Sequence, residues 1–386
     1  MTDNQYKMIY AFHHNPLDPS IGAGVRMSKV LSLLGERCGL PVTLYAMGNR
    51  SYEMRVEGIS EKVIRKPFLF RNLKSSFLCM FPFTLSSHLR KQLFPLTATP
   101  ALLIFETPFF GYPLLKTQKL PKDSLKIYDA HNFEADYWKP YFHTIGTKWI
   151  WKRIKTMEKT VAEYVDYVFV TSLQDARAFE REYQIPSAKI IIVPNGVETN
   201  EVRPMRDPER ISRRTEFNAS YSKFVVFMGS NIKANIDAAN WIADSLAPRL
   251  EAVCFLIIGS VCKSMTNVPR NVRVLGVLPN DKKNRCLGIA DAALNPVIIG
   301  SGTNVKMLEY LSAGLPTVST TVGARGLEIE NGVNAIVCNL DEFEDRLLEI
   351  LNNDDLRSAL GAAARKKAED FDWNKILDRV IENIFA

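Results

Sequence analysis

The chain has 386 residues, of which 46% are apolar and 24% charged, with 20 Gly and 20 Pro. These fractions exclude collagenous, disulfide-scaffold and wholly disordered chains, and the length favours at least two domains, because single cores stop growing below about 250–300 residues. The six Cys form no CxxC pair and no cluster with His, a spacing that argues against zinc and iron–sulfur sites. No apolar run approaches the roughly 18–20 residues that span a bilayer, and the N-terminal residues lack a signal-peptide pattern, so we expect a cytoplasmic protein.

Positive charge is concentrated in the first half of the chain. Residues 1–200 carry 26 Lys and Arg against 18 Asp and Glu, whereas residues 201–386 carry 23 against 24. No acidic residue lies between Glu61 and Glu106, where Lys and Arg accumulate beside Phe. Two interpretations of residues 62–100 stay open: a surface for an anionic membrane leaflet or a lipid-diphosphate acceptor, or core Phe side chains beside a solvated basic face.

Short β-type runs alternate with helical patterns along the whole chain, which indicates α/β units with parallel sheets. In the first half we expect strands over 7–12, 42–46, 101–105, 126–129, 167–171 and 190–193, and helices over 25–34, 147–164 and 173–183. Pro194, Asn195 and Gly196 then form a strong turn signal. The polar, Arg-rich stretch 201–222 follows and is expected to join two domains.

The second half repeats this alternation. We expect strands over 224–228, 254–258, 272–275, 292–294, 317–320 and 335–337, and helices over 234–247, 304–312 and 342–352. The prediction is an α/β fold of two Rossmann-like, doubly wound domains, 1–200 and 201–368, whose strand ends face a central cleft. The last helix, within 369–386, has apolar residues at the spacing of one buried face and can pack back on the first domain.

The most specific segment of the sequence leads into the helix expected at 304–312. Glycines let the backbone approach a ligand, and the unpaired first-turn amides of a helix carry partial positive charge, so this segment has the local properties of a phosphate site. On the helix, Lys306 can neutralise a phosphate and Glu309 can accept hydrogen bonds from two ribose hydroxyls. The alternative is a surface ion pair at i,i+3 worth about 0.2–0.5 kcal/mol. The segment before the helix consists of Gly300, Ser301, Gly302, Thr303 and Asn304.

Residues 300–328 resemble the donor-binding block of the retaining, nucleotide-sugar-dependent glycosyltransferases with the GT-B fold, in particular those of family 4 (glycosyl transferases group 1). Further blocks occur in the order of that family, and the resemblance spans nearly the whole chain except 62–100. These blocks are residues 22–26, 167–175, 193–198 and 227–230.

The resemblance implies roles for single residues. Glu309 matches the second Glu of the Glu-x7-Glu motif, which holds the donor ribose, and Thr303 belongs to the loop whose amides meet the diphosphate. Gly22 and Gly24 match the glycine loop of the first domain, which approaches the diphosphate across the cleft. The expected nucleotide-sugar-binding residues are Gly22, Gly24, Gly229, Lys233, Gly300, Ser301, Gly302, Thr303, Asn304 and Glu309.

Two features depart from the family pattern. The first Glu of the motif falls at Ser301, so the usual contact to the sugar hydroxyls is missing or differently supplied. The Arg and Lys that often follow the first strand of the second domain fall at Ser230 and Asn235. Lys233 and Lys306 are therefore candidate replacements for the cations at the diphosphate.

His131 directly follows an expected strand of the first domain. In the family, a His at this position sits near the donor sugar or the acceptor hydroxyl, and an imidazole can donate a hydrogen bond or shift a proton near neutral pH. We therefore expect His131, with Lys306 and Glu309, among the catalytic residues, the alternative for a lone His being a hydrogen-bonded packing role. Weaker candidates at neighbouring strand ends are His13, His14 and Glu106.

The resemblance implies a retaining glycosyltransferase of EC 2.4, of hexosyltransferase type, in surface polysaccharide biosynthesis. We expect a nucleotide-diphosphate-sugar co-substrate, a glycan or lipid-linked acceptor, no metal and no other cofactor, at the inner face of the plasma membrane. No metal is expected because no carboxylate pair of the Asp-x-Asp type occurs in a suitable loop. The alternatives are a nucleotide-sugar 2-epimerase on the same fold and a non-catalytic binding module. No nucleic-acid partner is expected, because no helix-turn-helix, RNA-recognition or zinc motif accompanies the basic residues.

Overall fold

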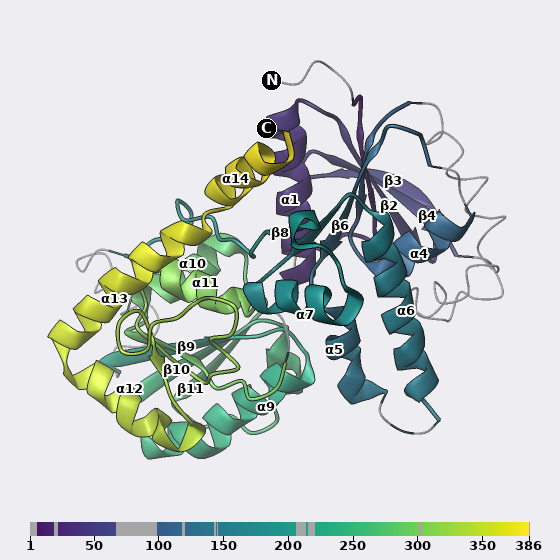
Figure 1. The fold of residues 1–386 in the computed structure, drawn as a ribbon. Helices are drawn as coiled ribbons and strands as arrows, with labels where there is room; N and C mark the ends of the chain where they lie inside the picture. Colours follow the sequence, from purple (N-terminus) through teal and green to yellow (C-terminus); the bar gives the residue numbers. More distant parts are fainter. Residues whose placement is uncertain are drawn as a thin grey trace. The chain divides into compact units, whose positions relative to one another are not determined.

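The computed structural model describes residues 6–18, 22–66, 99–117, 120–142, 144, 146–205, 214, 221–300 and 303–385. The chain forms two compact units, one of Met1–Pro194 with Ile376–Ala386 and one of Asn195–Lys375. Each unit has its own sheet, its own flanking helices and its own hydrophobic core (Figure 1). The sequence places the domain boundaries after residues 200 and 368, close to the divisions of the structure after Pro194 and Lys375.

An eight-stranded sheet runs through the first unit. Its strands are β1 (Ile9–Phe12), β2 (Val42–Gly48), β3 (Tyr52–Val56), β4 (Ile59–Arg65), β5 (Leu102–Phe105), β6 (Leu125–Ala130), β7 (Tyr167–Val170) and β8 (Ile190–Ile192). They lie in the order β3-β4-β2-β1-β5-β6-β7-β8. All neighbours are parallel except β3 and β4, which form an antiparallel hairpin at one edge. Strands β1 and β5 are buried throughout, as expected for parallel strands with helices on both faces.

Helices pack along this sheet and complete the first core. They are α1 (Gly22–Cys38), α4 (Pro108–Thr117), α5 (Glu134–Trp138), α6 (Lys148–Tyr164) and α7 (Leu173–Tyr183). The N-terminus of α7 is capped by Ser172, whose hydroxyl accepts a hydrogen bond from the amide of Asp175 at 3.1 Å. This cap explains why the predicted and observed bounds of α7 agree.

The last helix, α14 (Trp373–Phe385), returns to the first unit from Ile376 onward. Arg37 of α1 pairs with Asp378 of α14 at 2.9 Å, and Figure 1 shows the two helices near each other. Ile376, Leu377 and Val380 are almost completely buried. The apolar face that the sequence predicts for this helix therefore faces a core.

The second unit contains a six-stranded, fully parallel sheet. Its strands are β9 (Lys223–Met228), β10 (Val253–Ile258), β11 (Val272–Gly276), β12 (Ala292–Asn295), β13 (Thr317–Ser319) and β14 (Ile336–Val337), in the order β11-β10-β9-β12-β13-β14. The flanking helices are α9 (Lys233–Trp241), α10 (Asn280–Ile289), α11 (Val305–Ser312), α12 (Phe343–Asn352) and α13 (Asp354–Ala368). Parallel strands alternate with helices along this unit, as in a Rossmann-like domain.

The strand order of each sheet reverses direction at one point. In the first sheet, β2 and β5 lie on opposite sides of β1, and in the second sheet, β10 and β12 lie on opposite sides of β9. The loops after the two strands at such a point diverge to opposite faces and leave a crevice at the carboxyl ends of the strands, where ligands bind in open α/β sheets. The segments that follow β1, β5, β9 and β12 are therefore where each unit is built to hold a ligand.

Every strand expected from the sequence is present, but the hairpin of β3 and β4 was not predicted. Strand β3 has the sequence YEMRV, in which apolar and polar residues alternate, but it is only five residues long and both of its faces are largely exposed. The basic stretch 62–100 begins inside β4, and residues 67–98 lie outside the described part of the chain. No described helix is long and apolar enough to cross a membrane.

Candidate active site

A buried cluster of charged side chains lies at the strand ends of the first unit. Asp129 belongs to the end of β6, His131 follows that strand, Glu106 follows β5, and Arg26 projects from α1. Asp129 and Glu106 are fully buried, Arg26 is 2% exposed, and the side chain of His131 is 7% exposed. The protein can bury these charges because each of them has a partner of opposite charge or a hydrogen bond.

Two contacts organise this cluster. The guanidinium of Arg26 donates from Nε to both carboxylate oxygens of Asp129, at 3.2 and 3.1 Å, and from Nη2 to Oδ1 at 2.5 Å. Nε2 of His131 lies 2.9 Å from Oε2 of Glu106 and 3.8 Å from Oδ2 of Asp129. The direct partner of His131 is therefore Glu106, which the sequence indicates only as a weaker candidate.

The histidines after β1 lie beside this cluster. The ring of His13 is 4.4 Å from that of His14 and 6.4 Å from that of His131, measured between centroids. Nδ1 of His14 lies 3.0 Å from the hydroxyl of Thr107, and Nδ1 of His13 lies 2.7 Å from the carbonyl oxygen of Asn15. Burial lowers the pKa of His13 to about 4 and that of His14 well below its usual value, so both imidazoles are neutral near pH 7.

Gly22 and Gly24 lie in the first turn of α1, which begins at Gly22. The sequence resemblance describes them as a loop, whereas the structure places both inside the helix. A Cβ atom on Gly24 would come within 1.8 Å of the carbonyl oxygen of Asp18, so this position requires glycine. The close approach keeps the segment after β1 packed against the start of α1.

In the second unit, the expected phosphate site lies where α11 begins, close after β12. Gly300 has a φ of 147°, which side chains rarely tolerate, and Asn304 precedes the helix without a side-chain cap. The hydroxyl of Thr303 is buried and has no hydrogen-bond partner among the described residues. This polar atom and the uncapped helix start are groups that a bound anion would satisfy. Ser301 and Gly302 lie outside the described residues.

Lys306 does not pair with Glu309. Its ammonium donates to Oδ1 of Asn235 on α9 at 2.6 Å and lies 4.5 Å from the centroid of the Phe227 ring. The amide of Asn235 in turn donates to the carbonyl and the hydroxyl of Ser230. Burial lowers the pKa of Lys306 from 10.5 to about 7. The structure thus joins Lys306 to the two positions, Ser230 and Asn235, at which the family pattern has cations.

Glu309 lies one turn further along α11, and its Oε2 pairs with the ammonium of Lys283 on α10 at 2.6 Å. Both side chains are about one-fifth exposed, although Oε2 of Glu309 is itself buried. The next residue, Tyr310, is fully buried, and its hydroxyl accepts a hydrogen bond from the amide of Met228 at 2.7 Å. This contact ties α11 to the end of β9 and fixes the direction of Glu309.

Lys233 and Gly229 are the remaining candidates of this unit. The ammonium of Lys233 is 77% exposed and pairs with Asp237 of its own helix at 2.9 Å. Gly229 follows β9, and a Cβ atom there would come within 2.9 Å of the Asn235 side chain. Gly229 is therefore packed at the Lys306–Asn235 contact, whereas Lys233 points to solvent and is the weaker of the two replacement cations.

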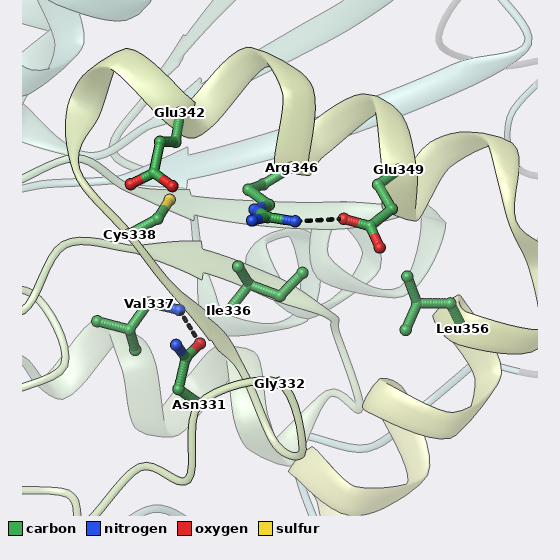
Figure 2. A pocket seen from close by; sticks show the side chains of 9 residues that line it. All are labelled: Asn331, Gly332, Ile336, Val337, Cys338, Glu342, Arg346, Glu349 and Leu356. Carbon is green, nitrogen blue, oxygen red and sulfur yellow. Dashed lines mark hydrogen bonds and ion pairs between the residues drawn. The ribbon is translucent and has the colours of Figure 1, made fainter.

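Two cavities lie elsewhere in the described structure. One, of about 330 Å³, lies beside β14 and α12 and is lined by Ile336, Cys338 and Arg346, among others; Figure 2 shows Arg346 paired with Glu349 at its edge. The other, of about 570 Å³, lies between β8 and α14 of the first unit. Neither is lined by a residue that the sequence predicts for the site.

Sequence reasoning did not identify the partners of the predicted residues. Glu106 was ranked low, and no role was given to Arg26, Asp129 or Lys283. Asn235 was noted only as a departure from the family pattern. Arg26 and Asp129 lie 103 positions apart and Lys306 and Asn235 lie 71 apart, so no local pattern connects them. The sequence did contain one signal for Glu106 and Asp129: both lie at the ends of expected strands, as His131 does.

Two protein-family models match the chain. The model described as Glycosyltransferase Family 4 matches residues 22–201, and the model described as Glycosyl transferases group 1 matches residues 222–353. Together they cover well over half of the chain. The first match contains the His131 cluster and the second contains the Lys306 and Glu309 site.

Individual relatives are distant. The D-inositol 3-phosphate glycosyltransferase of Thermobispora bispora is 23% identical over 71% of this chain, and the chain spans 65% of that relative's length. The sucrose-phosphate synthase of Thermosynechococcus elongatus superposes with a TM-score of 0.75 at 14% identity. Anabaena HepE, solved with UDP and glucose, superposes with a TM-score of 0.73 at 13% identity. Both structural matches cover 98% of this chain and 99% of the other chain, so they show that the fold is shared.

The lowered pKa of Lys306 leads to an expectation for stability. Because this lysine releases its proton on folding between pH 7 and its unfolded pKa of 10.5, it makes the free energy of unfolding rise with pH in that window. In Lys306→Met we expect a smaller rise between pH 7 and 9, measured by urea unfolding of the whole chain. The matched control is Lys233→Met, which removes an exposed ammonium and should keep the wild-type slope. An unchanged slope in Lys306→Met would show that its amine is solvated.

Proposed function

Because the chain belongs to the glycosyltransferases with the GT-B fold, we propose that it transfers a sugar from a nucleotide diphosphate sugar to a hydroxyl group of a glycan or lipid-linked acceptor. The observation that carries this proposal is the site at the start of α11. This site lies at the switch point of the second sheet. It brings together an uncapped helix end, a Thr303 hydroxyl with no partner among the described residues, the Lys306 ammonium and the Glu309 carboxylate.

Each group of this site suits one part of a nucleotide diphosphate. The first-turn amides of α11 and Lys306 carry positive charge toward the diphosphate, and the amine of Lys306 becomes fully charged when an anion binds beside it. Glu309 accepts hydrogen bonds from the ribose hydroxyls through the carboxylate that Lys283 orients. In the sequence, Ser301 occupies the position at which the family pattern has a Glu, so the sugar hydroxyls have to be held by other groups.

We propose that transfer retains the anomeric configuration and needs no metal ion. Attack on the same face of the sugar from which the diphosphate leaves needs no enzyme nucleophile, and the charge of the leaving diphosphate is stabilised by Lys306 and the helix end. His131 is proposed to contact the donor sugar or the acceptor hydroxyl from the first unit. The enzyme's contribution is the positioning of the two substrates and the stabilisation of the departing charge.

One observation favours a second candidate function, nucleotide-sugar 2-epimerisation. That reaction needs carboxylates for proton transfer, and Glu106 and Asp129 are two buried carboxylates within reach of His131. Both oxygens of Asp129 are already bound by Arg26, however, so it is poorly placed to accept a proton. We therefore place transfer first.

A labelled-donor assay tests the proposal. The whole chain is incubated with UDP-, GDP- and dTDP-sugars, with and without EDTA, over glycan and lipid-linked acceptors. We expect release of the nucleoside diphosphate with a glycosylated acceptor, equal rates in EDTA, and an anomeric configuration by NMR that matches that of the donor. Formation of a new nucleotide sugar would establish the epimerase instead. Donor binding without turnover over the whole panel would indicate a non-catalytic module.

Glu309→Ala tests the ribose contact. Loss of two charge-assisted hydrogen bonds, each worth about 1.5–3 kcal/mol, should weaken binding of the nucleoside diphosphate at least about a hundredfold in calorimetry. Lys283→Met keeps the carboxylate and should weaken binding less. Glu349→Ala, which removes an exposed carboxylate of α12, is the matched control and should bind as the wild type does. Equal affinity of Glu309→Ala and wild type would contradict the ribose role.

The acceptor side is proposed to meet an anionic membrane, in keeping with a lipid-linked acceptor at the inner face of the plasma membrane in surface polysaccharide biosynthesis. Most of the basic stretch 62–100 lies outside the described residues, but α6 supports the same idea. Trp149 is 49% exposed near its start, and Tyr141, in the segment before it, is 63% exposed. Lys139, Lys148 and Lys152 neighbour these aromatic rings in the sequence. Exposed aromatic residues among lysines are typical of surfaces that bind anionic lipid headgroups.

A matched pair on α6 tests this surface. We expect Trp149→Ala to reduce sedimentation of the protein with vesicles of 70% phosphatidylcholine and 30% phosphatidylglycerol by several-fold, because an aromatic anchor is lost. Tyr164→Ala removes a ring of similar exposure at the other end of the same helix and should sediment as the wild type does. Binding that is equal in both variants, or equal on vesicles of phosphatidylcholine alone, would contradict membrane docking through this surface.

A further inference from the structure

Glu106 is a buried carboxyl group that has only one partner. Its side chain is completely buried, Oε2 lies 2.9 Å from Nε2 of His131, and Oε1 has no hydrogen-bond partner among the described residues. A buried carboxylate with an unsatisfied oxygen is costly, so the site has to compensate its charge in another way.

The charges of the cluster show how this compensation occurs. Arg26 and Asp129 neutralise each other through three hydrogen bonds, which leaves Glu106 as the carboxylate without a permanent cation. If Glu106 were ionised beside a neutral His131, the buried cluster would carry one uncompensated negative charge. One additional proton between Oε2 and Nε2 makes the cluster neutral. Burial and the nearby Asp129 both raise the pKa of Glu106, which favours this proton.

The other titratable groups that face His131 do not change this balance. His13 and His14, after β1, have lowered pKa values and are neutral near pH 7. Glu134, at the start of α5, has its pKa raised to about 7 by burial and accepts a hydrogen bond from the Trp138 indole.

We propose that Glu106 is a positioning residue for the proposed sugar transfer: it shares one proton with His131 through Nε2 and thereby makes Nδ1 of His131 a hydrogen-bond donor to the substrate. With the proton between Oε2 and Nε2, the imidazole carries its other hydrogen on Nδ1, whichever of the two atoms holds the shared proton. A neutral His131 donating from Nε2 to an ionised Glu106 would instead leave a bare lone pair on Nδ1. The inference rests on the proposed function for the substrate, but the proton itself is a property of the free protein.

The same three side chains, Glu106, Asp129 and His131, also have the spacing of a metal site. The guanidinium of Arg26 already binds both oxygens of Asp129, and a divalent cation would have to displace it or lie next to it. The bound guanidinium therefore favours a shared proton over a metal ion as the charge that completes this cluster.

The proton is tested in the free protein by NMR with ¹⁵N-labelled histidine, which reports five residues in this chain. We expect His131 at pH 7 to show a hydrogen on Nδ1, whichever atom of the pair holds the shared proton, with its signals assigned by their loss in His131→Asn. In Glu106→Gln, which keeps the shape of the side chain but cannot transfer a proton to the ring, we expect a neutral ring whose hydrogen is no longer fixed on Nδ1. Glu163→Gln, an exposed change on α6, is the matched control and should leave His131 unchanged. A bare Nδ1 in the wild type would overturn the inference without any activity measurement.

Kinetics give a second, independent readout. In Glu106→Gln we expect kcat to fall at least about tenfold while the KM for the donor stays within about twofold, because only the donor hydrogen at the reacting atoms is lost. The pair loses its shared proton as the pH rises, so the decline of kcat at high pH should begin at lower pH in the variant. A parallel loss of kcat and stability with an unchanged pH profile would reduce Glu106 to a packing role. If the NMR result holds but no transfer occurs with the wild type, the proposed function fails and the proton inference stands.

Discussion

The buried ion pair between Arg26 and Asp129 is the contact on which the charged cluster of the first unit depends. It connects α1 to β6, and Nη1 of Arg26 also donates to the carbonyl of Val193, just after β8, at 2.7 Å. Removing one partner of such a pair leaves an uncompensated buried charge and typically costs about 3–5 kcal/mol. Because Arg26 neutralises Asp129, the charge of Glu106 has to be balanced through His131. The proposed proton between Glu106 and His131 is thus linked to an ion pair between a neighbouring helix and strand.

In the second unit, a cation on a different element lies beside a position at which the family pattern has a cation. The family pattern has a lysine on the segment after β9, where this chain has Asn235. The ammonium of Lys306, on α11, lies 2.6 Å from the side chain of Asn235. We infer that Lys306 restores the positive charge at nearly the same place, with Asn235 and Ser230 holding it by hydrogen bonds. Lys233 is nearer in sequence but is engaged with Asp237 at the surface.

In each unit, the candidate residues lie at strand ends at or beside the switch point of that unit's own sheet. A residue that ends a central strand is held by the ladder on both sides, whereas the loop after it is free to carry a polar side chain. Glu106 and His131 follow β5 and β6 in this way, and Gly229 follows β9. The supporting contacts come from helices: Arg26 from α1, Lys306 and Glu309 from α11, and Lys283 from α10. Such contacts keep polar groups in place without burying them unpaired.

The sequence by itself determined the parts of this protein that depend on local pattern. Strand β5 is a continuous apolar run and α7 begins at a Ser cap, and both were predicted within one residue of their observed bounds. The glycine-rich segment before α11 and the Glu309 motif were likewise visible, because a tight turn and a helix start impose their residues within a few positions. Strand β3 was missed although apolar and polar residues alternate in it, because a run of five residues is too short to distinguish an exposed edge strand from a loop.

Only the tertiary structure decided which of these groups act together. Three contacts join residues that no local sequence pattern connects. They are Lys306 with Asn235, Glu309 with Lys283, and His131 with Glu106. The physical reason is that burial and distance set the charge of a side chain, and both arise when separate strands and helices pack. From the sequence, Lys306 and Glu309 share one face of a helix. In the folded chain, Lys306 contacts Asn235 and Glu309 contacts Lys283. These different contacts determine the charge and the direction of each side chain.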